Sequence, residues 1–279
     1  MADYSLDDLL YLMSRLRDPK DGCPWDRAQD FSSIVPHTIE ESYELADAIE
    51  RGDFQQIREE LGDVLFQVVF YSQLGDEQKQ FDFNGIVSTL VDKLIRRHPH
   101  VFPEGSLESR VGHQAIGSQA IDSQTIKIAQ VKQTWEAIKA TERESKQQPG
   151  VLDDVPMALP ALTRAAKLQK RASQVGFDWD DIDEVLGQLR EEIDELIEAR
   201  EQHSAVEIAG ELGDVLFCLV NLARHLKVNP EAALRAANRK FENRFRYIEQ
   251  TLAENGHLPA EATLEQMDKL WGEAKEQGL

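Results

Sequence analysis

Two groups of carboxylates with the same internal spacing are the residues of this chain best suited to chemistry. The first reads Glu40-Glu41-x-x-Glu44 and, fifteen residues later, Glu60-x-x-Asp63; the second reads Glu191-Glu192-x-x-Glu195 and, again fifteen residues later, Glu211-x-x-Asp214. Residues i and i+3 share a helix face, so two consecutive helices can bring four carboxylates to one point. Such a concentration of negative charge is stabilised by cations. We therefore predict a divalent-metal site in at least one of the two copies.

The predicted metal ligands are all hard oxygen donors. They are Glu41, Glu44, Glu60 and Asp63 in the first copy and Glu192, Glu195, Glu211 and Asp214 in the second. Without Cys or His ligands, such a set favours Mg²⁺, or Mn²⁺ as a substitute, over zinc. A lone acidic pair carries no information in a chain with 51 acidic residues, so the prediction rests on the repeated combination.

The carboxylates belong to a longer duplicated pattern. Arg17-x4-Gly22-x-x-Trp25 matches Arg171-x4-Gly176-x-x-Trp179, the seven residues from Glu60 recur identically from Glu211, and Lys93-x3-Arg97 matches Lys240-x3-Arg244. Landmarks in one order indicate a tandem duplication. We predict an N-terminal domain at 1–145 with a mobile insertion at about 103–123, a linker at 146–154, and a C-terminal domain at 155–279.

Helical periodicity dominates both copies. Apolar residues recur at spacings of three and four, as in Leu61, Val64, Leu65 and Val68. Thr38-x-x-Glu41 and Thr263-x-x-Gln266 are typical of helix starts, and Asn229-Pro230 places Pro at a first helical position. No segment alternates as a strand does. We expect an all-α fold, a tandem duplication of a four- to five-helix bundle domain, assembled as a homodimer.

Glycines lie between the acids of both copies. Gly62 and Gly213 separate the glutamate and aspartate of the second half-motif. Because glycine lacks a Cβ, we expect both positions to let a neighbouring helix approach closely.

The composition of the chain limits which partners it can bind and where in the cell it is expected. A net charge of −20 argues against direct binding to nucleic acid or to an anionic membrane surface. The two cysteines, Cys23 and Cys218, form no CxxC or zinc spacing, which suits reduced thiols. The N-terminus has no basic and apolar export signal, and no apolar run is long enough to span a bilayer. We expect a cytoplasmic protein.

The motifs together resemble a known family. EExxE followed by ExxD, with Cys23-Pro24-Trp25-Asp26 upstream and Lys93-x3-Arg97-His98-Pro99-His100 downstream, is similar to the MazG nucleoside triphosphate pyrophosphohydrolases. The resemblance covers nearly the whole chain. It implies an all-α nucleotide pyrophosphatase fold and Mg²⁺-dependent cleavage of NTPs or dNTPs to the monophosphate and pyrophosphate, an acid-anhydride hydrolysis. It also implies that the eight acids bind metal.

Phosphoryl-transfer catalysis consists mostly of positioning and charge neutralisation. Glu192 or Glu195 would orient or deprotonate the attacking water, and the sequence leaves open which. The predicted substrate-binding residues are Lys240, Arg244, Arg246, Asn221, Asn238, Lys167, Lys170, Arg171 and Trp179 in the second copy, and Lys93, Arg96, Arg97 and Trp25 in the first. The cations would meet phosphates and the tryptophans would stack on a base. The alternatives are a solvated basic face or ion pairs for the cations, and core packing for the tryptophans.

The two copies differ where substrate would bind. Seven residues after the motif aspartate the second copy has Asn221 and the first has Phe70; before the basic pairs the second has Asn238 and the first has Val91. Amides can bind a sugar or a base, whereas Phe and Val can only pack. We predict that the C-terminal copy is the better catalyst and that the N-terminal copy is weaker, regulatory or structural. The alternatives are a narrow dUTP- or dCTP-type pyrophosphatase and a non-catalytic acidic helical interaction protein.

Overall fold

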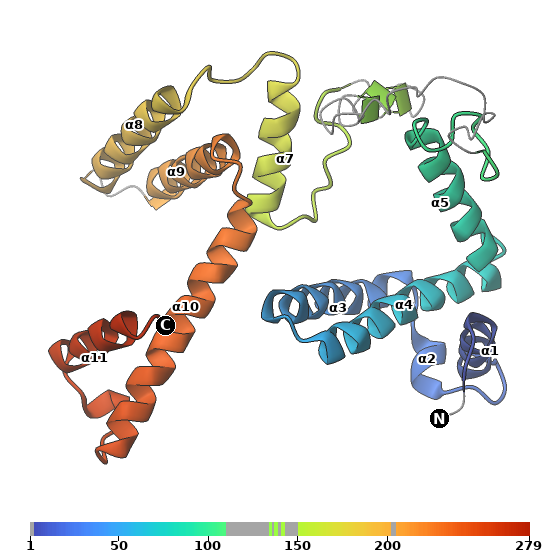
Figure 1. Ribbon diagram of the computed structural model, residues 1–279, viewed down its shortest axis with the longest axis horizontal. Helices are drawn as coiled ribbons and strands as arrows, with labels where there is room; N and C mark the ends of the chain where they lie inside the picture. The colour runs from blue at the N-terminus through green and yellow to red at the C-terminus, as the bar shows by residue number, and fades with distance from the viewer. Residues whose placement is uncertain (1–2, 110–133, 136, 139–140, 143–149, 202–204) are drawn as a thin grey trace, which may run out of the picture. The chain divides into compact units, whose positions relative to one another are not determined.

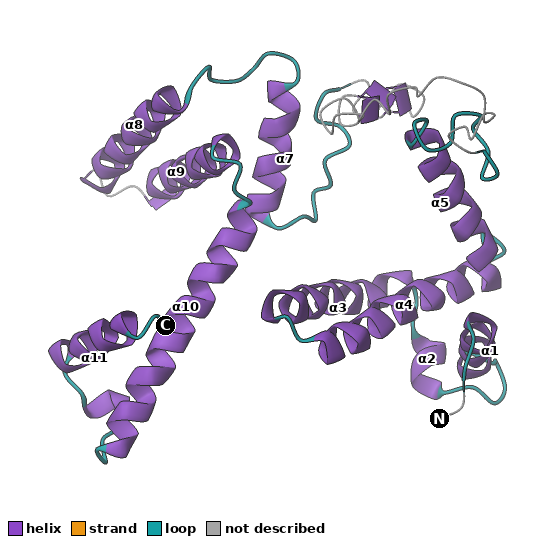
Figure 2. Ribbon diagram, viewed as in Figure 1, coloured by secondary structure: helices purple, strands orange, loops and turns teal. Residues whose placement is uncertain are grey.

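The computed structural model describes residues 3–109, 134–135, 137–138, 141–142, 150–201 and 205–279. All regular structure in these residues is helical, ten α-helices and one 3₁₀ helix, and none of them forms a strand (Figure 2). The all-α prediction is therefore confirmed. The chain divides into two compact units, Met1–Lys139 and Ala140–Leu279. The parts of the predicted insertion and linker at 110–123 and 146–149 lie outside the described residues.

The N-terminal unit is built around a helical hairpin. Its helices are α1 (Leu6–Leu16), α2 (Pro24–Ala28), α3 (Phe31–Arg51), α4 (Phe54–Glu77) and α5 (Phe83–Arg97) (Figure 1). Gly52 ends α3 in the left-handed conformation, at φ 71°, which glycine adopts without steric strain. Asp53 then caps α4 by accepting hydrogen bonds from the backbone N–H groups of Gln55 and Gln56. The short connection lays α4 back along α3, which brings the two halves of the acidic motif together.

The helix start predicted at Thr38 is wrong. Helix α3 begins at Phe31, where Asp30 and Ser33 form a reciprocal capping box. Thr38 lies inside the helix, donates its hydroxyl to the Ile34 carbonyl and lies 3.0 Å from the Tyr71 hydroxyl. A threonine in mid-helix can bond the carbonyl four residues back, so the same residue type suits both positions. By contrast, Thr263 and Gln266 form the predicted capping box at the start of α11.

Apolar residues from α1, α3 and α4 form the core of the N-terminal unit. Met13, Ile34, Val69, Phe70 and Leu74 are its fully buried members. At one side of this core Arg17 forms a two-pronged ion pair with Glu77 at 2.8 Å, and its guanidinium lies over the Phe70 ring. The pair ties the end of α1 to the end of α4.

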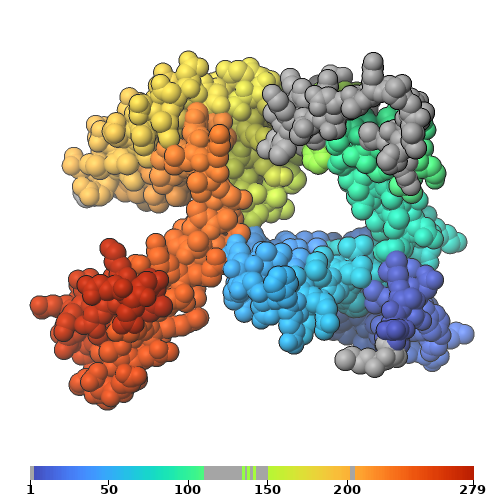
Figure 3. All heavy atoms as spheres, in the orientation of Figure 1, coloured from blue at the N-terminus to red at the C-terminus, as the bar shows by residue number. Residues whose placement is uncertain are grey.

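The C-terminal unit repeats the hairpin. Its helices are α7 (Ala161–Ser173), α8 (Ile182–Glu201), α9 (Ala205–His225), α10 (Pro230–Glu254), η1 (Pro259–Glu261) and α11 (Leu264–Glu276). Helix α8 pairs with α9, and α7 packs on α9. Helix α11 lies against the C-terminal part of α10, as the red and orange atoms in Figure 3 show. Asn229 caps α10 through the Ala232 N–H, with Pro230 at the first helical position, as predicted.

The close helix approach predicted at Gly62 and Gly213 does not occur in the part of the chain that the structure describes. A Cβ built at either position meets no atom within 4 Å. Both glycines face open space there, so packing inside the described chain does not explain them.

Among the described residues, none of the helices combines the length and the apolar character that a membrane span needs.

Candidate active site

The second carboxylate motif forms a compact cluster between α8 and α9. Glu192, Glu195 and Glu211 each place one carboxylate oxygen within 4.8 Å of the other two. Burial, and then the negative charges of Glu195, Asp214 and Glu192, raise the pKa of Glu211. Asp214 lies outside this group of three, although its charge acts on Glu211. Gln188 donates a hydrogen bond to Glu192 at 2.8 Å and holds that carboxylate in place.

The first motif forms the matching cluster between α3 and α4. Glu41, Glu60 and Asp63 bring their oxygens within 4.8 Å of one another. Glu60 is only 7% exposed and accepts a hydrogen bond from Gln56. Burial, followed by the charge of Asp63, raises the pKa of Glu41. Glu44 lies outside the group of three, and burial and then the charge of Glu60 raise its pKa.

The donor chemistry of both clusters fits a hard divalent cation. Every converging atom is a carboxylate oxygen, the ligand type that Mg²⁺ prefers. Like charges held this close repel one another, and a bound cation removes that repulsion. The spacing of the acids along each hairpin therefore produces the clustering that a metal site requires, in both copies.

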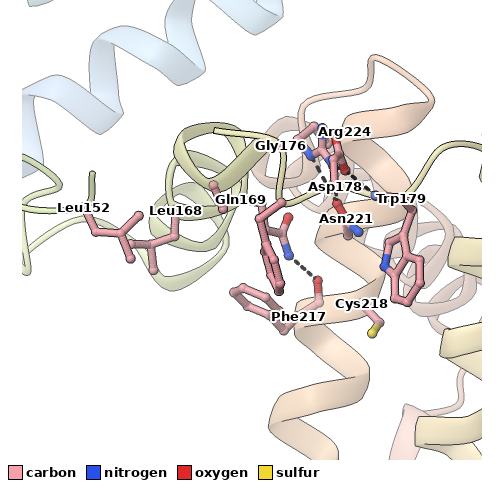
Figure 4. Close-up of a pocket in the computed structure, with 12 residues that line it drawn as sticks. Leu152, Leu168, Gln169, Gly176, Asp178, Trp179, Phe217, Cys218, Asn221 and Arg224 are labelled. Carbon is pink, nitrogen blue, oxygen red and sulfur yellow. Dashed lines mark hydrogen bonds and ion pairs between the residues drawn. The ribbon is translucent and has the colours of Figure 1, made fainter. Parts of the chain in front are cut away.

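A cavity of about 560 Å³ is lined by residues of α7, of the segment after α7 and of α9 (Figure 4). Its walls are largely apolar and include Leu168, Phe177, Trp179 and Phe217. The volume lies within the ~300–1,000 Å³ range of small-molecule pockets. Asn221, one of the predicted substrate-binding residues, also lines it. The cavity shares α9 with two of the carboxylates, Glu211 and Asp214.

Arg224 organises the polar side of the cavity (Figure 4). Both of its terminal nitrogens donate to the Asp178 carboxylate, one of them at 2.8 Å. Its Nε and Nη2 also donate to Asn221 Oδ1, at 3.1 and 2.7 Å. His225 Nε2 lies 3.2 Å from the same Asp178 carboxylate. The hydrogen bonds from Arg224 are the main reason that the pKa of Asp178 is lowered.

Cys218 connects the cavity to the carboxylates. It lines the cavity and lies one helical turn after Asp214 on α9. Burial, and then the charges of Glu192 and Asp214, raise the pKa of its thiol. The cavity therefore opens directly next to the acidic cluster.

The corresponding place in the first copy is filled. Phe70, the counterpart of Asn221, is 0% exposed and belongs to the core of the N-terminal unit. The ion pair of the second copy also has no counterpart, since Pro24 and Gln73 stand where Asp178 and Arg224 do. The two copies thus share the acids and differ in what surrounds them.

Both clusters fall within segments that match one known domain. The sequence profile of the MazG nucleotide pyrophosphohydrolase domain matches residues 29–102 and 181–248. The chain belongs to the MazG family. The resemblance inferred from the motifs is thereby confirmed, and nucleotide pyrophosphohydrolases are hydrolases of acid anhydrides.

Relatives of this MazG chain match it along most of its length. The nucleoside triphosphate pyrophosphohydrolase of Escherichia coli (strain K12) is 47% identical over 276 residues, 98% of each chain. The nucleoside triphosphate pyrophosphohydrolase/pyrophosphatase MazG of Thermotoga maritima is 41% identical over 274 residues, 98% of this chain and 97% of that one. The uncharacterized protein YabN of Bacillus subtilis is 41% identical over 269 residues, 95% of this chain and 50% of the relative.

The cations predicted to bind phosphates do not line the cavity of this MazG chain. On α7, Lys167 and Lys170 are exposed, and Arg171 pairs with Asp154 at 2.5 Å. On α10, Asn238 and Lys240 are exposed and Arg246 lies 3.4 Å from Glu242. Arg244 donates to the Leu279 carbonyl at 2.6 Å and lies over the Trp271 ring.

The predicted residues of the first copy lie on α2 and α5. Lys93, Arg96 and Arg97 occupy the last turns of α5. Trp25 is half exposed on α2, with its ring 6.0 Å from that of His37. Their role in substrate binding stays a prediction.

Sequence reasoning missed three polar residues of the MazG cavity: Gln169, Asp178 and Arg224. A usable signal was present in the duplication. The second copy has Asp178 and Arg224 where the first has the uncharged Pro24 and Gln73. The two copies therefore differ by two charges of opposite sign. Such a paired difference indicates that the two side chains meet, as Asp178 and Arg224 do.

Proposed function

We propose that this chain is a Mg²⁺-dependent nucleoside triphosphate pyrophosphohydrolase whose C-terminal copy is the main active site. It would hydrolyse NTPs and dNTPs to the monophosphate and pyrophosphate with broad base tolerance. The observation that carries the proposal is the open cavity beside Glu192, Glu195 and Glu211, where the first copy has Phe70 in its core. Relatives named for this activity at 47% and 41% identity support it.

The acidic residues of the second copy would have two roles, metal binding and activation of the attacking water. Glu192, Glu195, Glu211 and Asp214 would hold Mg²⁺, which neutralises triphosphate charge and favours ionisation of water when bound. Either Glu192 or Glu195 would orient the attacking water and accept its proton. The water oxygen forms a bond to the α-phosphorus, the bond from that phosphorus to the α,β-bridging oxygen breaks, and pyrophosphate leaves with the electron pair.

The aromatic walls of the cavity support the proposed broad base tolerance. Trp179, Phe177 and Phe217 present aromatic side chains to it. Every nucleobase has a flat π-face, and stacking on aromatic side chains depends weakly on base identity. A site that recognises bases by stacking would accept all four.

The phosphate-binding cations remain part of the proposal. Lys240, Arg244 and Arg246 would meet the β- and γ-phosphates, with help from Lys167, Lys170 and Arg171, and Asn238 would contact the substrate. In the first copy Lys93, Arg96, Arg97 and Trp25 would serve a weaker or regulatory site. Because α10 carries the first three outside the cavity, substrate binding would require α10 to close on the cavity or a second copy of the chain to supply these residues.

A homodimer is supported by the apolar residues that both hairpins leave exposed. Leu61, Leu65 and Val68 form an exposed stripe on α4, and Leu212, Leu216 and Leu219 form the same stripe on α9. Exposed apolar patches of this kind mark interaction surfaces. A second copy of the chain is the proposed occupant, because short helical bundles often pair their exposed apolar faces with another chain. Light scattering of the full chain tests this proposal: a mass of two copies supports the homodimer, and a mass of one copy contradicts it.

Pyrophosphate release from a panel of NTPs and dNTPs with Mg²⁺ tests the function. Comparable release from all bases supports the proposal. Release from dUTP or dCTP alone would replace it with a narrow pyrophosphatase. No release from any nucleotide would overturn it in favour of an acidic interaction protein.

A further inference from the structure

Two side-chain amides in the cavity are each held in one orientation by their partners. Gln169 Nε2 donates to the Phe217 carbonyl at 2.8 Å. A carbonyl oxygen only accepts, so the NH₂ end of Gln169 must face it and the Oε1 end must face away. Asn221 Oδ1 accepts two hydrogen bonds from Arg224. A guanidinium only donates, so the oxygen of Asn221 must face it and the NH₂ end must face away.

The outward ends of these amides have no partner among the described residues. Gln169 is 8% exposed, and its Oε1 is buried without a hydrogen bond. A buried acceptor without a donor is unfavourable, so an unpartnered one inside a cavity indicates a ligand donor. The NH₂ group of Asn221 likewise donates to no described residue, because both of the hydrogen bonds formed by its amide are made through Oδ1.

The two amides meet at one turn of α9. Gln169 donates to the carbonyl of Phe217 on α9. In a helix, the backbone N–H of residue i+4 points to the same carbonyl, and that residue is Asn221. Both side chains line the same cavity (Figure 4). The cavity is therefore lined by one oriented acceptor from α7 and one oriented donor from α9, between largely apolar walls.

We propose that Gln169 and Asn221 bind the hydrogen-bonding edge of the nucleobase, Gln169 as acceptor and Asn221 as donor. This rests on the proposed function of the same site. Adenine and cytosine carry an amino group beside a ring nitrogen, and guanine and uracil carry a ring N–H beside a carbonyl. Each base thus offers a donor next to an acceptor. Adenine and cytosine present the two in one order and guanine and uracil in the reverse order, so the second group would meet the same pair of amides with the base turned over. Arg224 acts as a positioning residue, because it sets the orientation of Asn221.

Two ATP analogues test the pair on the wild-type protein. Purine riboside triphosphate lacks the amino group that would donate to Gln169, and 1-deaza-ATP lacks the ring nitrogen that would accept a hydrogen bond from Asn221. We expect kcat/KM for each analogue to be about 3- to 10-fold below that for ATP, mainly through KM, as for the loss of one hydrogen bond. Equal kcat/KM for ATP and both analogues would overturn the proposal whatever the variants do.

Variants assign each contact to its residue. Gln169→Met should lower kcat/KM for ATP and remove the preference for ATP over purine riboside triphosphate, while keeping the preference over 1-deaza-ATP. Asn221→Leu should show the reverse pattern, and Gln250→Met, an exposed site on α10, should keep both preferences. If a residue has a purely structural role, its substitution should lower kcat/KM equally for all three nucleotides, and that result would overturn the assignment. Failure of the proposed function is distinct, since wild type would then release no pyrophosphate from ATP.

Discussion

Phe70 and Asn221 stand at the same position of the duplicated motif and have opposite surroundings. Each follows the motif aspartate by seven residues, Phe70 on α4 and Asn221 on α9. Phe70 is fully buried among Met13, Val69 and Leu74, whereas Asn221 lines a cavity of about 560 Å³ and accepts hydrogen bonds from Arg224. The two hairpins thus carry similar carboxylate clusters, but only in the second does this position border an open cavity.

Replacing Asn221 by Phe should close the cavity as Phe70 does in the first copy. We expect kcat/KM for ATP to fall about 100-fold, the size of loss that follows when a substrate is misplaced in its site. The thermal midpoint should change little, because the apolar ring enters apolar walls while Arg224, which loses its hydrogen bonds to Asn221, keeps its ion pair with Asp178. Steady-state pyrophosphate release measures the effect. Asn243→Phe, at an exposed site on α10, is the matched control and should behave as wild type. Full activity in Asn221→Phe would rule out the cavity as the substrate site.

The reverse substitution, Phe70→Asn, should destabilise the N-terminal unit. It removes a buried ring and places an amide in an apolar core, at a cost of about 3–5 kcal/mol in the free energy of unfolding. Urea unfolding followed by circular dichroism measures this cost. Phe54→Asn is the control, since Phe54 is 84% exposed and its loss should change stability by less than about 0.5 kcal/mol. Equal effects of the two substitutions would show that Phe70 is not a core residue.

The ion pair between Arg17 and Glu77 should make the N-terminal unit sensitive to acid. The hydrogen bond from Arg17 is the main cause that lowers the pKa of Glu77 below its ordinary 4.5. A carboxyl with a lowered pKa in the folded state adds stability above pH 4.5, and that contribution is lost as the pH falls through the folded-state pKa. As the pH is lowered below 4.5, the thermal midpoint of wild type should therefore fall more steeply than that of Glu77→Gln. Parallel curves would show that the pair adds nothing to stability.

Divalent cations should stabilise the protein through the carboxylate clusters. Binding to the folded state alone adds about 2.7 kcal/mol when the cation is present at 100 times its Kd. We expect Mg²⁺ to raise the thermal midpoint and Glu211→Gln to reduce that rise, because it removes a carboxylate from the second cluster. Glu249→Gln, at an exposed site on α10, should keep the full rise. An equal rise with NaCl of the same ionic strength would indicate charge screening alone.

Local patterns in the sequence predicted the helices and the two acidic clusters well. The spacing of three between acids places them on one face of a helix, and a short turn at Gly52 brings α4 back along α3. These are local consequences of helix geometry. Comparison of the two copies also singled out Asn221, which lines the cavity; its role in substrate binding stays a prediction.

The remaining features depend on contacts between distant segments. Gln169 reaches the Phe217 carbonyl and Asp178 reaches Arg224 only once α7 and the segment after it have packed on α9. The helix start at Thr38 was misplaced because Asp30 and Ser33 supply a complete capping box further upstream. The predicted role of Lys240, Arg244 and Arg246 depends on the position of α10 in the functional assembly, which no local pattern encodes.

The most direct test of the central claim compares Glu195→Ala with Glu44→Ala, the matched substitutions in the two copies. Pyrophosphate release from ATP with Mg²⁺ is measured for both variants and for wild type. If the C-terminal copy is the main active site, Glu195→Ala loses activity by about 100-fold or more, as expected when a group acting in the transition state is removed, while Glu44→Ala retains most of it. Activity that survives Glu195→Ala, or falls equally in both variants, would contradict the claim.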